Sequence, residues 1–252
     1  LFGADGKTLW GALPGLTRSE RLMEIEDGTV HELARVNWNG KPALAIAVGR
    51  SRESLQAPVQ LYVLPLHSDK PFSVFTFRGT RNDVAMLAPL MRDGQVTEGV
   101  AFGYFVSKYH TKVLSFSMEE MTVLMPETRM LTSFTQMTRE GGTVNVGGRI
   151  YGNEKGLPGD LRVGDEILEV EGGVRAITVA NTGPVAEPRL YVSDGWDAAY
   201  AKKAKAQIKE LRLMQGRRRL VPIGGSADEY SFFRIWGRDV DGDGVDEIFA
   251  RG

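Results

Sequence analysis

Carboxylate side chains gather near the end of the sequence, in the stretch DVDGDGVDE at residues 239–247. Asp239, Asp241 and Asp243 stand two residues apart, with glycines between and after the last two, and Glu247 occupies the ninth position. Ca²⁺ prefers about six to eight oxygen ligands, and a tight loop brings alternate residues toward one point. The spacing therefore predicts a calcium site formed by Asp239, Asp241, Asp243, the backbone carbonyl of Val245 and Glu247.

The same stretch has two other possible interpretations, an EF-hand and a hairpin turn that binds no metal. An EF-hand needs a bidentate Glu at the twelfth position and a second helix, but Ala250 occupies that position and residues 247–252 have the composition of a strand. The interpretation as an ordinary hairpin turn that binds no metal stays open, because Asp-Gly pairs are also strong hairpin signals. Neighbouring carboxylates repel one another unless they are neutralised, which favours the calcium site.

The segment DVDGDGVDEIFARG at residues 239–252 resembles the repeat of FG-GAP/VCBS (integrin-α-type) β-propellers. Segments 35–49, 91–103 and 185–195 look like further copies that have lost the metal-binding carboxylates. The resemblance implies a propeller with at least one structural Ca²⁺. It also implies a recognition or adhesion module, in which loops on one face of a rigid disc hold a protein or glycan ligand.

The rest of the chain has the pattern of an all-β fold, with short alternating runs bounded by Gly, Pro, Asn and Asp. At roughly 50 residues per four-stranded unit, the length predicts a single propeller domain over 1–252 with about five blades. The predicted strands are 31–36, 42–49, 59–64, 72–77, 84–91, 96–106, 113–118, 122–125, 132–138, 143–151, 166–171, 175–181, 189–193, 220–223, 232–238 and 247–251.

The two ends of the chain carry complementary halves of one repeat. In the resembled family the acidic turn and its strand are followed by an outer pair, and the first ten residues, LFGADGKTLW, supply such a pair. We therefore expect the last blade to be built from both termini, with Leu1–Trp10 beside Glu247–Arg251, which would remove exposed sheet edges. Alternatively, both ends belong to separate incomplete blades of a longer protein.

Two segments are ambiguous. Apolar residues recur at helical spacing after Asp197, yet the resemblance predicts a strand over Lys205–Met214. The glycine-rich stretches 141–148 and 155–160 are typical of blade turns or an inserted loop. They lack the spacing of a phosphate-binding loop.

Composition narrows the classes of partner and chemistry that are expected for this protein. Lys and Arg number 31 against 32 Asp and Glu, so the basic cluster within 202–219 is expected to be a solvated face, with no nucleic acid partner. The chain has no cysteine, which excludes disulfides and thiolate chemistry. No apolar run approaches the roughly 20 residues of a transmembrane span. Leu1 in place of Met indicates a processed or trimmed product, and the calcium loop favours an extracellular or periplasmic location.

Signals for catalysis are weak. His31, His67 and His110 are isolated and form no metal or nucleophile motif, so no catalytic residue is predicted. The sequence favours a non-catalytic module. Two alternatives stay open: a polysaccharide hydrolase or lyase that uses carboxylates in a central channel, and a structural assembly subunit. Trp10, Trp38, Trp196 and Trp236 are expected to pack between blades, with a sugar-stacking or partner-docking surface as the alternative.

Overall fold

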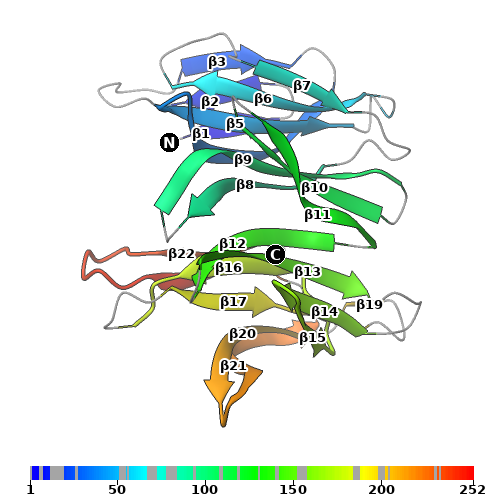
Figure 1. The fold of residues 1–252 in the computed structure, drawn as a ribbon, viewed down its shortest axis with the longest axis vertical. Coiled ribbons are helices and arrows are strands. Elements are labelled where there is room, and N and C mark those ends of the chain that lie inside the picture. The colour runs from blue at the N-terminus through cyan, green and yellow to red at the C-terminus, as the bar shows by residue number, and fades with distance from the viewer. Residues whose placement is uncertain are drawn as a thin grey trace. The chain divides into compact units, whose positions relative to one another are not determined.

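The computed structural model of the protein (Figure 1) describes residues 2–5, 8–11, 20–25, 28–50, 55, 57–66, 73–77, 84–92, 95–107, 110–117, 120–129, 131–139, 142–151, 158–183, 188–197, 202–203, 205–229, 232 and 234–252. Throughout these residues the secondary structure consists of β-strands, which confirms the all-β prediction. The strand predicted at 205–214 is confirmed, and the helical alternative is wrong for that segment. The described residues include no helix that is long and apolar enough to cross a membrane.

The chain divides into two compact units, one formed by Leu1–Leu90 with Val96–Thr128 and the other by Met91–Gln95 with Arg129–Gly252. The first contains a three-stranded sheet of β1 (Phe2–Asp5), β2 (Thr8–Gly11) and β3 (Glu20–Glu24). Its second sheet has eight strands: β4 (Thr29–Trp38), β5 (Lys41–Gly49), β6 (Val59–Pro65), β7 (Ser73–Phe77), β8 (Val84–Arg92), β9 (Gln95–Phe105), β10 (His110–Phe116) and β11 (Met121–Arg129).

The eight-stranded sheet consists of two runs of four consecutive strands, β4–β7 and β8–β11, which meet where Asn37 pairs with Gly99. Strand β5 shows how the sheet is packed on both faces. Ala43, Ala45 and Ala47 join an apolar cluster with residues of β9 and β10, such as Phe102 and Phe116. The alternate residues of β5 pack with Ile25 in a second cluster. Burial of both faces accounts for the nearly continuous apolar sequence of this strand.

The turn between β4 and β5 follows directly from its sequence. Asn39 and Gly40 have φ values of 53° and 66°, and the flanking Trp38 and Lys41 are paired. Two central residues with positive φ define the tight hairpin turn that Asn-Gly favours. The strand, polar turn and strand predicted within 35–49 are therefore confirmed.

The second unit contains two four-stranded antiparallel sheets and two shorter strand pairs. The first sheet comprises β12 (Leu131–Arg139), β13 (Gly142–Tyr151), β14 (Pro158–Val163) and β15 (Glu166–Val170). The second comprises β16 (Ala176–Ala180), β17 (Arg189–Ser193), β20 (Lys205–Met214) and β21 (Arg217–Glu229). The shorter pairs are β18 (Trp196–Asp197) with β19 (Lys202–Lys203), and β22 (Arg234–Arg238) with β23 (Glu247–Arg251).

Apolar side chains join these sheets face to face. One cluster combines Val146 and Leu161 of the first sheet with Ile177 and Val192 of the second. Another combines Tyr191 of β17 with Ile235 of β22 and Ile248 of β23. The hairpin β22–β23, red in Figure 1, is thus held against the sheet that contains β16 and β17.

The glycines of segment 142–148 lie within strand β13, so the interpretation of this segment as turns or an inserted loop is wrong, while the strand predicted at 143–151 is confirmed. The surroundings of Gly148 explain why a strand contains glycine here. A Cβ added there would overlap the Val174 side chain, whose Cβ would be only 2.8 Å away. Glycine is needed at this position because two layers approach closely, and no turn is involved.

The terminal strands do not pair as expected. Strand β1 pairs with β2 and strand β23 pairs with β22, so Phe2 and Ile248 belong to different sheets. The predicted pairing of Leu1–Trp10 beside Glu247–Arg251 is therefore wrong for the described strands. Each terminal strand has instead found a partner a few residues away in the chain, and closing a short loop costs less entropy than joining distant segments.

Candidate functional site

The acidic loop connects the two strands of the hairpin β22–β23. Arg238 at the end of β22 pairs with Glu247 at the start of β23, so residues 239–246 form the connection. Ile235 is buried beneath the hairpin, and a Cβ added at Gly237 would overlap the Ala180 methyl group. The hairpin therefore lies directly on β16, which gives the loop a rigid base.

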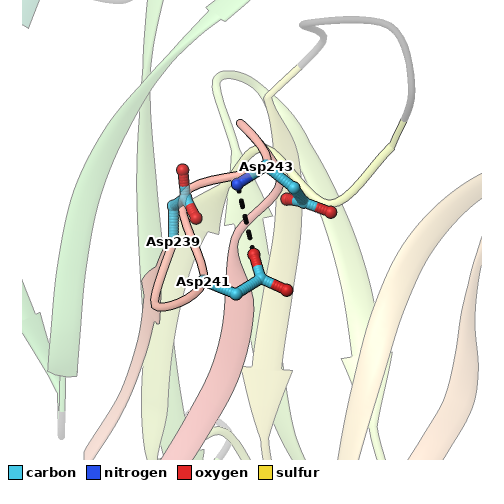
Figure 2. Close-up of side chains that lie close together, drawn as sticks. All are labelled: Asp239, Asp241 and Asp243. Atoms are coloured by element: carbon cyan, nitrogen blue, oxygen red, sulfur yellow. Dashed lines mark hydrogen bonds between the residues drawn. The ribbon is translucent and has the colours of Figure 1, made fainter.

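Asp239, Asp241 and Asp243 surround a single turn (Figure 2). Each can offer one carboxylate oxygen such that the three atoms lie within 4.8 Å of one another. Gly242 and Gly244 have φ values of 81° and 85°. Only glycine adopts this left-handed conformation without strain, so the two glycines let the chain turn back twice within five residues. The structure therefore brings together the first three residues of the predicted set.

Backbone N–H groups hold these carboxylates in place. Asp239 accepts hydrogen bonds from the N–H groups of Gly242 (2.7 Å) and Gly244 (3.0 Å). Asp241 accepts one from Asp243 (3.2 Å), drawn in Figure 2, and Asp243 accepts one from Val245 (2.8 Å). Within the described part of the chain, no Lys or Arg forms an ion pair with the three aspartates. The loop thus fixes the side chains while their charges are left without a cationic side chain to neutralise them.

The other two predicted ligands lie at the end of the loop. Glu247 accepts a hydrogen bond from the N–H of Val240 (2.9 Å) and so closes the base of the loop. It does not belong to the group of three convergent carboxylates. The N–H of Val245 points its hydrogen toward Asp243.

Asn181, which follows β16, is a further residue of this site that the sequence did not indicate. Its backbone N–H donates to Asp246 Oδ2 (2.7 Å), and its side-chain Nδ2 donates to the carbonyl of Gly244 (3.0 Å). In return, the Asp246 N–H donates to the Asn181 carbonyl (2.6 Å). The two segments are 65 residues apart in sequence, and the only signal for Asp246 was its place in the acidic run.

The chemistry of the donor set fits a hard divalent cation. Asp239, Asp241 and Asp243 present only oxygen atoms, which suit Ca²⁺ or Mg²⁺ and exclude a preference for soft metals. Asp241 and Asp243 are exposed, so water could complete the coordination shell. A cation at this position would offset the mutual repulsion of the three charges.

The histidines show no catalytic arrangement in the described part of the chain. The ring of His31 is bonded to the Arg50 carbonyl (3.0 Å), and the ring of His110 to the Ser107 hydroxyl (3.0 Å). His67 lies outside the described residues. Both described rings therefore join neighbouring backbone or turn groups, as structural histidines do.

The buried carboxylates of the second unit are held in ion pairs. Asp160 pairs with Arg149, Asp194 pairs with Lys209, and Glu210 pairs with Arg189 and Arg212. The hydrogen bonds that the Arg212 guanidinium donates to Glu210 raise the pKa of Arg212. Such pairs neutralise buried charge and do not form the convergent acids that a glycosidase needs.

Two members of the predicted basic cluster are thus engaged by acidic partners, Lys209 with Asp194 and Arg212 with Glu210. Arg218 is bound by Glu166 of the neighbouring sheet. Arg217 and Arg219 are exposed. Three of the eight Lys and Arg residues of the cluster are thus paired with carboxylates of the second unit.

The tryptophans fall into two environments. Trp38 is 1% exposed in the core of the first unit, as predicted. Trp236 is 41% exposed and stacks on Phe249, so the prediction of core packing is wrong for it. The side chains of Trp10 and Trp196 lie outside the described residues.

Comparisons with known proteins assign no family to this chain. No protein-family model matches the sequence, and no curated protein matches it.

Proposed function

We propose that this protein is a non-catalytic recognition module of the β-propeller kind, stabilised by Ca²⁺ in the loop 239–247. The observation that carries the proposal is the convergence of three aspartate oxygens within 4.8 Å on a hairpin pinned to the neighbouring sheet. Asp239, Asp241 and Asp243 would ligate the ion directly, with the Val245 carbonyl and Glu247 as the further ligands expected from the spacing.

The order of the sheets supports the propeller part of the proposal. Strands β4–β7, β8–β11 and β12–β15 are each runs of four neighbours in sequence, as propeller blades are. Where adjacent sheets pack within a unit, they do so through apolar clusters. At this size the chain would hold about five blades.

Calcium would stabilise the loop by neutralising the negative charges of its three aspartates. Three exposed or half-buried carboxylates on a short turn bind Ca²⁺ weakly, in the range of about 0.1 to 1 mM found in extracellular modules. We therefore include an extracellular or periplasmic location in the proposal. The partner would be a protein or a glycan, and not a nucleic acid, because the chain has a net charge of only −1 and three of the eight Lys and Arg residues of its basic cluster are paired with carboxylates.

Thermal unfolding in calcium and in chelator tests the proposal. With free Ca²⁺ about ten times above the dissociation constant, binding should contribute ~1.4 kcal/mol and raise the melting temperature by about 3 to 5 °C. Asp241→Ala should abolish this shift. Asp165→Ala provides the matched control, since Asp165 is an exposed turn aspartate outside the loop. Equal melting of the unmodified protein in both conditions would contradict the calcium site.

A further inference from the structure

The hairpin β20–β21 extends past the rest of its sheet as a two-stranded ribbon. Pairing between β17 and β20 ends at Tyr191 and Glu210, whereas pairing between β20 and β21 continues to Met214 and Arg217. Figure 1 shows this part of the hairpin, in orange, pointing away from the other strands of the second unit. The hairpin end, residues 211–220, therefore has no third strand beside it among the described strands.

Apolar side chains are exposed on both faces of the hairpin end. Leu211 and Leu220 pack against the apolar cluster that joins the two sheets. Leu213 lies two positions further along β20 and so on the same face, yet it is 73% exposed. Met214 lies on the opposite face and is 45% exposed. Single exposed apolar side chains are common, but these two successive residues place apolar surface on both faces of a projecting ribbon.

The charge of the hairpin end is entirely positive. Residues 211–227 contain no Asp or Glu but hold four arginines: Arg212, Arg217, Arg218 and Arg219. Two of these are paired, Arg212 with Glu210 and Arg218 with Glu166. Arg217 and Arg219 are exposed and form no ion pair within the described part of the chain. Arg217 stands opposite Met214, so an unneutralised positive charge lies beside an exposed apolar side chain.

We propose that the hairpin end docks the protein on an anionic lipid surface, with Leu213 and Met214 entering the acyl boundary and Arg217 and Arg219 lying among the headgroups. Burial of apolar area and attraction to charged headgroups both contribute to binding at such an interface. The inference goes beyond the recognition function proposed above and does not depend on the calcium site.

The distribution of the exposed side chains favours lipid over other partners. A protein that packed on the ribbon as a neighbouring sheet would cover one of its faces, whereas lipid surrounds an inserted end on both faces. A nucleic acid would gain little from two free arginines. The hairpin end also has no aromatic ring on which a base could stack.

Sedimentation of the full chain with lipid vesicles tests the proposal. The assay is run in chelator, because Ca²⁺ itself binds anionic lipids. We expect salt-sensitive binding to vesicles of phosphatidylglycerol and phosphatidylcholine in equal parts, and much weaker binding to phosphatidylcholine alone. Leu213→Ser combined with Met214→Ser, and Arg217→Gln combined with Arg219→Gln, should each weaken the binding by about tenfold or more. Arg251→Gln, which removes an exposed arginine of β23, is the matched control and should have no effect.

A labelled cysteine tests insertion directly and remains informative if the double Ser variant fails to fold. Because the chain has no cysteine, Met214→Cys introduces a single thiol that can carry an environment-sensitive dye. We expect its emission to shift toward the blue when anionic vesicles are added. Ile223→Cys is the matched control, since Ile223 is 46% exposed and lies further along β21, away from the turn. The dye at this position should show no shift.

Several results would overturn the proposal. These are no binding to the anionic vesicles, equal binding to the neutral vesicles, binding that both double variants leave unchanged, and equal dye shifts at positions 214 and 223. Binding of soluble glycerophosphoglycerol with the same affinity would show a phosphate site in place of a lipid surface. Self-association that disappears with Leu213→Ser would show that a second copy covers the hairpin end instead. Because these assays contain no free calcium, their outcome is separate from that of the calcium test.

Discussion

Asn181 and Asp246 hold each other through reciprocal hydrogen bonds: the Asn181 N–H donates to Asp246 Oδ2 at 2.7 Å, and the Asp246 N–H donates to the Asn181 carbonyl at 2.6 Å. This pair joins the acidic loop to the segment after β16. The loop is therefore part of the packed structure of the second unit, and its geometry depends on a segment far away in the sequence.

Replacing Asp246 should loosen the loop. Asp246→Ala removes the acceptor for the Asn181 N–H and should lower the free energy of unfolding by about 1 to 2 kcal/mol, the lower part of what a hydrogen bond to a charged group contributes, because Asp246 is only half-buried. Asp246→Asn retains a side-chain oxygen and should cost less. Chemical denaturation of both variants measures the difference. Identical midpoints for the Ala and Asn variants would show that the side-chain bond contributes nothing.

Gly244 should resist substitution because of its backbone conformation. Its φ is 85°, and no atom lies within 4 Å of a Cβ added there, so the cost of Gly244→Ala is strain alone, about 1 to 2 kcal/mol. The variant should also reduce the thermal shift produced by calcium, since the Gly244 N–H orients Asp239. Gly244→Asn should be milder, because Asn tolerates the left-handed region. If Ala and Asn behave alike, backbone strain is not the cause.

Gly148 should resist substitution for a different reason. An added Cβ would overlap Val174, so Gly148→Ala should destabilise the second unit by about 1 to 3 kcal/mol through overpacking. Gly224→Ala is the control, because Gly224 also lies in a strand but has open space at the Cβ position. The two variants should differ clearly in thermal melting. Equal stability would mean that the sheets separate easily at β13.

The buried ion pair between Arg149 and Asp160 supports a fourth prediction. The Arg149 Nε donates to Asp160 Oδ1 at 2.8 Å, and both side chains are less than one-tenth exposed. Asp160→Leu leaves a buried guanidinium without this partner and should cost about 3 to 5 kcal/mol. The double variant Arg149→Met with Asp160→Leu should recover most of that loss, which a double-mutant cycle measures. If the double variant is less stable than Asp160→Leu alone, charge pairing matters more at this site than desolvation.

Local sequence was sufficient where the signal depended on neighbours in the chain. The turn at Asn39 and Gly40 follows from a short pattern, whereas the local spacing after Asp197 favoured a helix and only the family resemblance predicted the strand at 205–214. Local sequence also accounts for the convergence of Asp239, Asp241 and Asp243, because the two glycines with positive φ that shape the turn directly follow Asp241 and Asp243. Each of these features closes over only a few residues, so backbone preference and side-chain alternation specify it.

Tertiary structure decided what depends on which sheet packs against which. Trp38 and Trp236 both lie in strands of hairpins, yet one is buried and the other is exposed, because only the first has a second layer over its face. The pairing of Asn181 with Asp246 and the contact of Gly148 with Val174 have the same origin. The terminal strands likewise paired locally although their sequences looked complementary. Alternation along a strand determines that one face is apolar, but it does not identify the sheet that covers that face.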